Sequence, residues 1–543
     1  MPDAPPADEP DDSTFAPLAT PAFRWIWAAT VVSNVGTWMQ SVAAQWHMTG
    51  LTDSAALVSM VQGVTAGAIF LLVLPAGVVS DLVNRRRLLI ASQVWAMAAS
   101  ATLAACAWAG WLNAPGLLGL TFAVAVGAAV SRPAWQAVVP QLVGRDVLPA
   151  ALTLNSLAVS MARAVGPVAA GALVAASGPV AAFTLNAASF AAVIAALVKW
   201  LPAPPPAAGP REGFSEALAV GLRYALHDPE LKSVLLRTST FMLGAAGLMS
   251  LLPLVAADGL ELEADGYGLM LGFLGAGSIA GGLLLARLRR WLGAGGVVLA
   301  GTAVFAAVTV GVALSPSLWL TGPLLALAGV GWTAVLTGLN VAAQVALPDW
   351  VRARGLSIYT FAWFAGLTGG SLGWGLSADA LGLRTTLLLA AAATGGTLLL
   401  AGRHRLPDPA AAGDLSPSDA WPAVELPDCA RAQKRRVLVT LVYRVPVERA
   451  AEFAAAMAPL GDARLRTGAS RWGLYQDAAD PGRWLELFRV PTWEGHLRQH
   501  ARWSVADQAV QDAVHEIARP EVRSAGDDSP SSEARHWLAP AEE

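Results

Sequence analysis

The sequence predicts an all-α, multi-pass membrane protein that carries a small soluble α+β domain near its C-terminal end. Hydrophobic residue types make up 55% of the 543 residues and charged types only 14%, whereas average soluble chains carry about 25% charged residues. Only 32 of the 75 charges lie between residues 22 and 403, too few to cover the surface of a soluble protein of that size. Apolar stretches of about 20 residues, long enough to cross a bilayer, recur throughout that region.

Twelve such stretches can be counted, and we expect each to form a membrane-spanning helix. They fall into two groups of six, separated by a longer connection. The predicted spans are 23–47, 55–80, 88–112, 115–139, 151–176, 179–201, 233–257, 266–288, 295–315, 318–346, 355–378 and 383–402.

The segments around these spans complete the predicted domain organisation. Residues 1–21 are acidic and proline-rich and lack the basic start of a signal peptide, so we expect a disordered cytoplasmic segment before a retained first helix. The first half then covers 22–201 and the second 233–403. Between them, 202–232 opens with a stiff PAPPPAAGP stretch and continues as an amphipathic helix at the membrane interface.

The basic residues predict the orientation. Lysine and arginine gather in alternate loops, including Arg85–Arg87 and Arg287–Arg290, and such loops face the cytoplasm. We therefore expect a protein of the cytoplasmic membrane with both termini inside. A net charge of −3 gives no basic field for nucleic acid.

The two halves carry local echoes that indicate a duplication. The second span is followed by Gly77-Val-Val-Ser-Asp81 and the basic run Arg85–Arg87. The eighth is followed by Gly282-Leu-Leu-Leu-Ala286 and the basic run Arg287–Arg290. Spans four and ten each lead through a proline to arginine in the same way.

The segment Leu74–Arg87 is the sharpest motif. Gly77 allows close helix approach, and Asp81 stands beside Arg85, Arg86 and Arg87. A carboxylate there can pair with the guanidinium groups, or cap a neighbouring helix, in one conformation and release them in another. The plainer interpretation is an ordinary positive-inside loop, which explains the arginines but not the spacing from Gly77 to Asp81.

This motif resembles the loop between helices two and three of the major facilitator superfamily, although Leu82 and Asn84 depart from the family pattern. The stretch Pro133–Ser156, followed by Arg163, Gly166, Pro167 and Gly171, resembles the branch of enterobactin exporters and related transmembrane secretion effector proteins. The last four residues resemble a fifth-helix motif of exporters. The resemblance implies a secondary transporter that exports a small amphipathic compound by alternating access and is driven by protons.

Polar and charged residues inside the spans are candidates for the substrate cavity, because their burial in lipid is costly. The plainer interpretation of each amide is hydrogen bonding between helices, and for Arg132 it is a side chain that reaches to the interface. Proton coupling follows from the resemblance alone, since no acidic residue lies in the middle of a span. The cavity candidates are Asn34, Trp38, Gln62, Arg132, Gln136, Asn155, Arg163, Asn340 and Gln344.

After a linker at 404–431, residues 432–520 alternate as strand, helix, two strands and helix. The order predicts a small ferredoxin-like cytoplasmic domain, which resembles the antibiotic-biosynthesis monooxygenase type and would bind a ligand or self-associate. Residues 521–543 are expected to be disordered. His496 and His500 lie one helical turn apart, but this spacing is more often that of solvated helix residues than of a metal site.

No metal-ligand spacing, phosphate loop or catalytic motif stands out, so we expect no cofactor, no metal and no enzymatic activity. The favoured function is export of a siderophore, antibiotic or similar metabolite. Uptake by the same fold is the first alternative. The second is a membrane-tethered enzyme or sensor that acts through the C-terminal domain.

Overall fold

The computed structural model describes residues 15–144, 147–200, 214–407, 413–418, 435–518 and 535–538. Its contacts divide the chain into two compact units, which are described separately below. The first unit contains Met1–Pro210, Leu235–Asn340 and Tyr359–Arg405, and the second contains Arg211–Val234, Val341–Ile358 and Leu406–Glu543.

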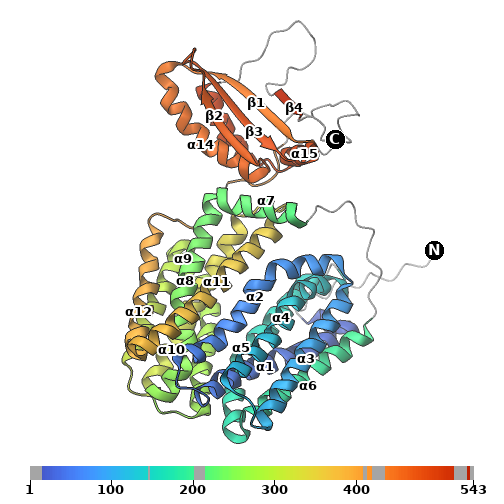
Figure 1. Ribbon diagram of the computed structural model, residues 1–543, viewed down its shortest axis with the longest axis vertical. Helices are drawn as coiled ribbons and strands as arrows, with labels where there is room; N and C mark the ends of the chain where they lie inside the picture. The colour runs from blue at the N-terminus through green and yellow to red at the C-terminus, as the bar shows by residue number, and fades with distance from the viewer. Residues whose placement is uncertain are drawn as a thin grey trace, which may run out of the picture. The chain divides into compact units, whose positions relative to one another are not determined.

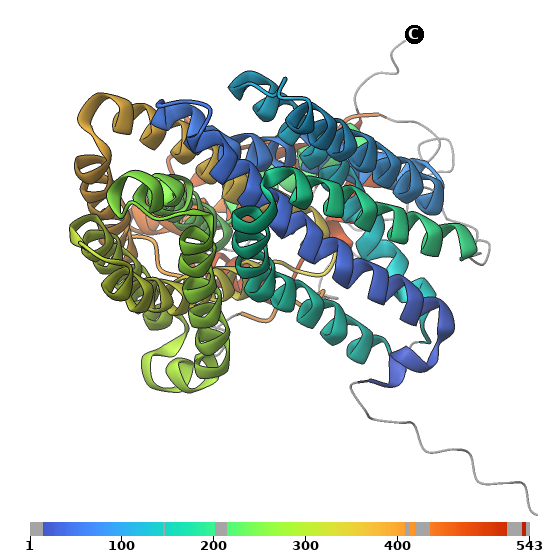
Figure 2. The ribbon, with the colours of Figure 1, turned by 90° about the horizontal axis from the view of Figure 1, so that it is seen from below.

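Long helices build the first unit (Figure 1). Seen from below, α1 to α6 lie on one side and the helices from α8 to α12 on the other (Figure 2), which is the arrangement expected of two halves. The first group is α1 (Pro21–Thr49), α2 (Ala55–Leu82), α3 (Arg85–Trp108), α4 (Ala114–Leu142), α5 (Leu148–Ser177) and α6 (Pro179–Lys199). The second is α8 (Pro229–Leu254), α9 (Ala264–Leu314), α10 (Leu318–Val345), α11 (Arg352–Leu381) and α12 (Leu383–Gly396). Three short helical turns complete the bundle: η1 (Ala16–Ala19), η2 (Val255–Gly259) and η3 (Thr397–Ala401).

Polar residues at the helix starts define several boundaries. Ser54, Asn84 and Asn113 each accept a hydrogen bond from the backbone amide three residues later, which satisfies one of the unpaired amides of a helix N-terminus. Asn84, a departure from the family pattern, is therefore the cap of α3.

Nine helices of the described residues are long and apolar enough to cross a membrane. Helix α9 counts once among them, although the sequence predicts two spans, 266–288 and 295–315, within its length. Two helices meet within it at a kink, the non-helical backbone of Gly293, and this kink falls between the two predicted spans. Helices α1 and α11 are not among the nine.

Corresponding junctions of the two halves share an unusual backbone. Gly178, between α5 and α6, and Gly382, between α11 and α12, both have positive φ, 74° and 80°. Side chains other than glycine are strained in this region, so the same residue type serves the same turn in both halves. This supports the duplication indicated by the sequence echoes.

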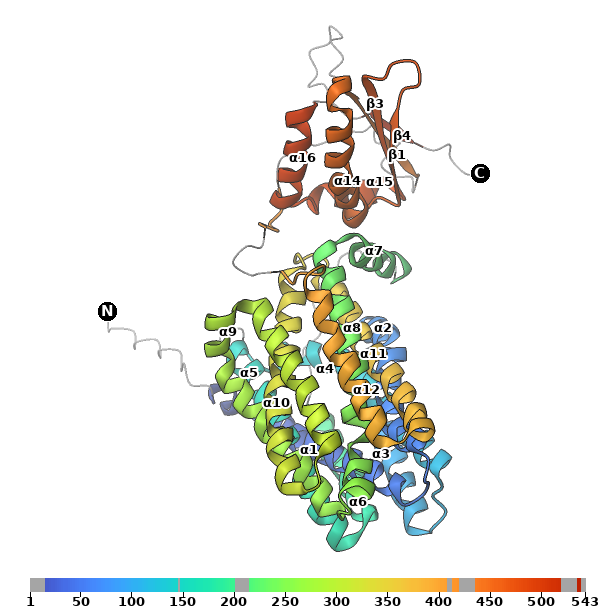
Figure 3. The same ribbon diagram turned by 90° about the vertical axis from the view of Figure 1, so that its left-hand side faces the viewer.

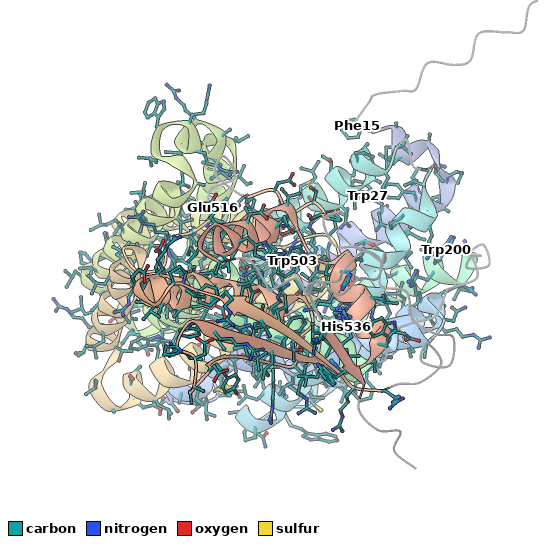
Figure 4. All side chains as sticks on the ribbon, turned by 90° about the horizontal axis from the view of Figure 1, so that it is seen from above. Phe15, Trp27, Trp200, Trp503, Glu516 and His536 are labelled. Carbon is teal, nitrogen blue, oxygen red and sulfur yellow. The ribbon has the colours of Figure 1, made fainter. Side chains whose placement is uncertain are left out.

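The first half is held by an apolar cluster and by buried amides. Phe23, Ile26 and Leu197 belong to a core against which Trp27 packs and to which Trp200 contributes. Figure 4 labels Trp27 and Trp200. Deeper in the bundle, the buried Gln40 Oε1 accepts a hydrogen bond of 2.6 Å from Asn186 Nδ2. Such bonds between helices satisfy polar groups that would otherwise be costly in lipid.

The second unit contains the connecting helix α7 (Phe214–His227) and a four-stranded antiparallel sheet in the order β2-β3-β1-β4. The helices that follow β1 in the chain lie on one face of the sheet (Figure 3). The strands are β1 (Val437–Arg444), β2 (Arg471–Gln476), β3 (Arg483–Val490) and β4 (Arg535–Leu538). The helices are η4 (Val447–Arg449), α14 (Ala450–Thr467), α15 (Trp493–Ala501) and α16 (Val505–Ile517).

The alternating burial of β1 places Val437, Val439 and Leu441 in the core of this domain. A buried ion pair between Arg464 Nε and Glu486 Oε1, at 3.2 Å, crosses the same core. Tyr443 donates a 2.9 Å hydrogen bond to the other oxygen of Glu486, so the carboxylate is compensated on both sides.

One described segment differs from the expected disorder. Residues 535–538, placed by the sequence in a disordered tail, form β4 and pair with residues 437–440 of β1. Short pairing to a sheet edge needs only a few extended residues, which composition does not reveal. In the linker, Ser418 donates a 2.7 Å hydrogen bond to the carbonyl of Trp503. The rest of the predicted terminal segments and linkers, at 1–14, 201–213, 419–434, 519–534 and 539–543, lies outside the described residues.

Candidate functional site

A carboxylate of the second half caps a helix of the first. Asp379, in the last turn of α11, accepts hydrogen bonds from the backbone amides of Ala55 at 2.6 Å and Ala56 at 3.3 Å. Its other contact is the hydroxyl of Ser54, at 2.9 Å. These are the unpaired amides at the N-terminus of α2, where the helix dipole favours negative charge. Nearby, Gly375 packs directly on Ala56 and Ser59, so α11 and α2 approach closely at this end.

The predicted fifth-helix motif meets α1 in the interior. The guanidinium of Arg163 lies over the ring of Trp38, 5.8 Å from its centroid, within the range of a cation–π contact. Gly166 lies against the same tryptophan, because a Cβ atom there would be 2.6 Å from Trp38 Cβ. Arg163 Nε is buried and has no hydrogen-bond partner in the described part of the chain. A buried cationic donor is thus held against an aromatic face.

Gly171, the last residue of this motif, is part of a contact between the halves. A Cβ atom at Gly171 would lie 2.8 Å from the Cα of Gly268 in α9. Only glycines allow backbones to approach this closely. The motif therefore contributes both to the interior contact at Trp38 and to the packing of α5 on α9.

A third contact between the halves joins α1 to α9. Tyr267 donates a 3.2 Å hydrogen bond to Gln45 Oε1 and stacks on Trp46 with ring centroids 5.8 Å apart. Beside it lies a pocket of about 450 Å³, to which Trp46, His47 and Glu263 contribute. Asp379, the Tyr267 contact and the glycine pair lie at or toward the end of the bundle at which α1 ends and α2 begins, here called the Asp379 end.

The loop between α2 and α3 is described in part. Gly77 and Asp81 lie in α2, but their side chains are outside the described residues. Arg86 donates to the carbonyls of Leu197 at 2.9 Å and Val198 at 2.7 Å. It therefore caps the C-terminus of α6, where cations are favourable. Arg87 is exposed.

The remaining cavity candidates do not converge on Arg163. Arg132 lies over the ring of Phe364 in α11, 6.0 Å from its centroid, and Gln136 is exposed. Gln344 is exposed and belongs to the second compact unit. Half-buried positions within the helices of the first unit are occupied by Asn34, Gln62, Asn155 and Asn340.

Three histidines cluster in the C-terminal domain. His496 Nε2 lies 2.9 Å from His536 Nε2 and 3.2 Å from His500 Nε2. Burial, then the neighbouring histidines, lower the pKa of His496 to about 3, and similar causes lower the pKa of His500 to about 4. Within the described ranges, no group of three or more His, Cys, Asp or Glu side chains is arranged to hold a metal ion. At neutral pH the cluster is therefore uncharged.

These features suit reversible conformational change and the binding of a solute more than covalent chemistry. The Asp379 cap and the glycine pair are contacts between two halves, and each can form in one arrangement of the halves and separate in another. Arg163 and Trp38 offer a charge and an aromatic surface. Arg163, Gly166 and Gly171 are among the candidates named from the sequence, and their roles stay predictions, whereas Asp379 was not among those candidates.

Comparisons with known proteins agree with this arrangement. The family model described as "Transmembrane secretion effector" matches residues 12–525. The enterobactin exporters EntS of Shigella boydii serotype 4 (strain Sb227) and Escherichia coli O6:K15:H31 are each 26% identical to this chain over 390 residues. These alignments cover 70% of this chain and 90% of each exporter.

Solved structures share the fold. A bacterial homologue of the human lysosomal transporter Spinster, in an inward-facing and unoccupied conformation, is similar with a TM-score of 0.53 and 14% identity, over 70% of this chain and 94% of that one. The nucleoside transporter NupG is similar with a TM-score of 0.54 and 10% identity, over 71% of this chain and 100% of that one.

Proposed function

Because the chain belongs to the transmembrane secretion effector family of major facilitator transporters, we propose that it exports a small amphipathic metabolite, of the siderophore or antibiotic class, by alternating access. The family match over residues 12–525 carries this proposal. The resemblance to enterobactin exporters supports export over uptake, and a match to transporters along nearly the whole chain gives little support to a membrane-tethered enzyme or sensor.

The proposal includes twelve membrane spans in two halves of six. Helices α1 and α11, of 29 and 30 residues, are long enough to cross a bilayer. Helix α9, of 51 residues, is long enough for two crossings that meet near Gly293. With nine apolar helices of which one counts twice, these two additions make twelve.

We further propose that this is a cytoplasmic-membrane protein with both termini in the cytoplasm. The arginine-bearing junctions, such as Arg85–Arg87, fall at the end opposite Asp379, with Arg384 as the exception, and by the positive-inside tendency that arginine-rich end faces the cytoplasm. The Asp379 end then faces outward. The capped α2, the glycine pair and the Tyr267 contact support a state that is closed to the outside. The β-α-β-β-α-α-β order and the sheet order support a ferredoxin-like C-terminal domain with a binding role.

For the substrate we propose a flat or aromatic molecule with an anionic or strongly accepting group. Arg163 would take the anionic group, because a buried guanidinium donates strong, charge-assisted hydrogen bonds. Trp38 would stack on the ring. Of the other cavity candidates, Arg132 would line the path. Protons are the proposed coupling ion, taken from the family resemblance.

Reconstitution into liposomes tests the function. Liposomes that contain the purified protein are loaded with candidate metabolites, and efflux is followed with and without an imposed pH gradient. We expect saturable flux that depends on the protein and is accelerated by the gradient. If every candidate leaves protein-free vesicles as fast as vesicles with the protein, transport is contradicted. If the flux needs the protein but does not respond to the pH gradient, only the proposed proton coupling is contradicted.

A further inference from the structure

The second compact unit joins three stretches that are far apart in the sequence. It contains α7 with the start of α8, the junction of α10 and α11 between residues 341 and 358, and the C-terminal domain. The first two belong to the connections of the helix bundle, whereas the third follows the last helix. The contacts among these three stretches hold the second unit together.

Tyr224 joins α7 to the α10–α11 junction. Its hydroxyl donates a 3.0 Å hydrogen bond to the carbonyl of Ala346, and its ring meets Trp350 edge-on at 5.8 Å. Gly221, one turn earlier, lies against Arg354 in the first turn of α11. The buried face of α7 is therefore Val220, Tyr224 and Ala225, while Leu222 and Leu226 of the same helix are exposed.

The C-terminal domain contacts both of these segments. Helix α14 packs against α7, and Arg466, near its end, is ion-paired with Asp507 at the start of α16. Arg466 also interacts electrostatically with Asp228, between α7 and α8. On the other segment, the guanidinium of Arg502 lies 4.6 Å from the ring centroid of Trp350. The domain thus has one charged and one cation–π attachment.

The charged attachment is buried. Asp228 is 9% exposed and caps α8 by accepting a 2.7 Å hydrogen bond from the amide of Leu231. Burial raises the pKa of Asp228. Burial alone would lower the pKa of Arg466, but the charges of Asp507 and Asp228 raise it. Removal of Arg466 would leave two buried carboxylates without their cation, which is strongly unfavourable.

Helix α11 takes part in these contacts with its first turn and in the Asp379 cap with its last. Helix α11 is continuous from Arg352 to Leu381, so its first turn lies against α7 and its last turn holds Asp379. A rigid helix that tilts to withdraw Asp379 from α2 must also move its first turn. Contacts that restrain the first turn therefore oppose that tilt.

We propose that the C-terminal domain is an intramolecular clamp that holds α7 against the α10–α11 junction through Arg466–Asp228 and Arg502–Trp350, and so favours the state in which Asp379 caps α2. A contact made in one state only shifts the population toward that state by its own free energy. The clamp itself rests on the contacts above, and its consequence for export rests on the proposed function.

Two measurements on the full-length protein in nanodiscs test the clamp, and neither uses a substrate. Hydrogen exchange follows the amides of α7. Spin labels at Asp53→Cys and Ala380→Cys, in a Cys106→Ser, Cys429→Ser background, report the separation of α2 and α11. Arg466→Ala is expected to raise exchange in α7 at least tenfold and to increase the long-distance population at least threefold. Arg471→Ala, an exposed arginine on β2, is the matched control and should change neither.

Protection of β1 and β3 shows whether the domain of Arg466→Ala is still folded. If it is not, Trp350→Ala removes the second attachment from the junction side and is expected to give the same two changes. Unchanged exchange in α7 in both variants would overturn the clamp. Raised exchange with unchanged label distances would overturn its effect on α11. Failure of the liposome flux, by contrast, would contradict the export proposal and leave both of these readouts unaffected.

Discussion

The carboxylate of Asp379, in the last turn of α11, accepts a 2.6 Å hydrogen bond from the backbone amide of Ala55, in the first turn of α2. This single contact joins the two halves of the bundle through a side chain and a helix terminus. A charge at a helix N-terminus is stabilising without a partner cation, so the contact can be made and broken without leaving an unpaired basic residue behind. Such a contact is suited to a gate.

Replacement of Asp379 by asparagine tests this gate. Asparagine keeps the size and one acceptor but loses the negative charge, so we expect the closed Asp379 end to lose about 0.5–1 kcal/mol of stabilisation. The population open at that end should rise two- to fivefold, measured by the distance between labels on α2 and α11. Asp258→Asn, an exposed acid in η2, is the control. An unchanged population in the Asp379 variant would remove the gating role.

Arg163 is expected to set affinity for the substrate. A charge-assisted hydrogen bond contributes about 1.5–3 kcal/mol, so Arg163→Ala should raise the KM for an anionic substrate roughly tenfold or more. Arg163→Lys keeps the charge and should recover part of the loss. Trp38→Ala should raise KM for aromatic substrates more than for aliphatic ones. Arg24→Ala, at an exposed site in α1, is the control, and an effect of equal size there would argue against a specific site.

A larger residue at Gly171 should block closure of α5 on α9. Because a Cβ atom there already meets the backbone of Gly268 at 2.8 Å, Gly171→Val must separate the helices. We expect expression to persist and transport to fall at least tenfold, with cysteine labelling from outside showing a more open Asp379 end. Gly282→Ala, where a Cβ atom meets nothing within 4 Å, should transport normally.

Much of the fold could be predicted because lipid imposes a length and a composition on each helix. The strands β1 and β3 were likewise visible as alternating patterns. The pairing of β4 was not predicted, because it depends on a partner strand distant in the sequence. The short segment 535–538 carries no periodic signal long enough to indicate a strand.

Candidate site residues could be named from the sequence only where the residue type is unusual in its setting. Arg163 stands out as a charge within a span, and Gly166 and Gly171 through the family motif. Asp379 does not, since an acid at a helix end is ordinary and nothing in the sequence shows that the N-terminus of α2 lies beside it. For Arg86 the sequence named the residue but not its contact. This arginine was expected in a gating cluster, and in the structure it caps the C-terminus of α6.

The gating role of Asp81, at the end of the bundle opposite Asp379, stays a prediction and can be tested by substitution. Asp81→Asn removes the charge that can pair with the arginine run or with a helix terminus, and we expect transport to fall at least tenfold while the protein still folds. Size-exclusion profiles and expression levels check folding, and liposome flux checks transport. Normal export by a well-expressed Asp81→Asn protein would remove the gating assignment from the loop between α2 and α3.

The histidine cluster predicts loss of local stability in acid. Burial lowers the pKa of His496 to about 3 and of His500 to about 4 in the folded domain, whereas an unfolded histidine titrates near about 6.5. As the pH falls below this value, the unfolded state takes up protons that the folded state refuses, so stability decreases from about pH 6.5 toward the folded pKa values. At pH 5.5 each such histidine should favour opening about tenfold. Hydrogen exchange of α15, corrected for intrinsic rates, should therefore accelerate between pH 7 and 5.5. His500→Gln should weaken this acceleration, and an equal acceleration in that variant would assign it to other groups.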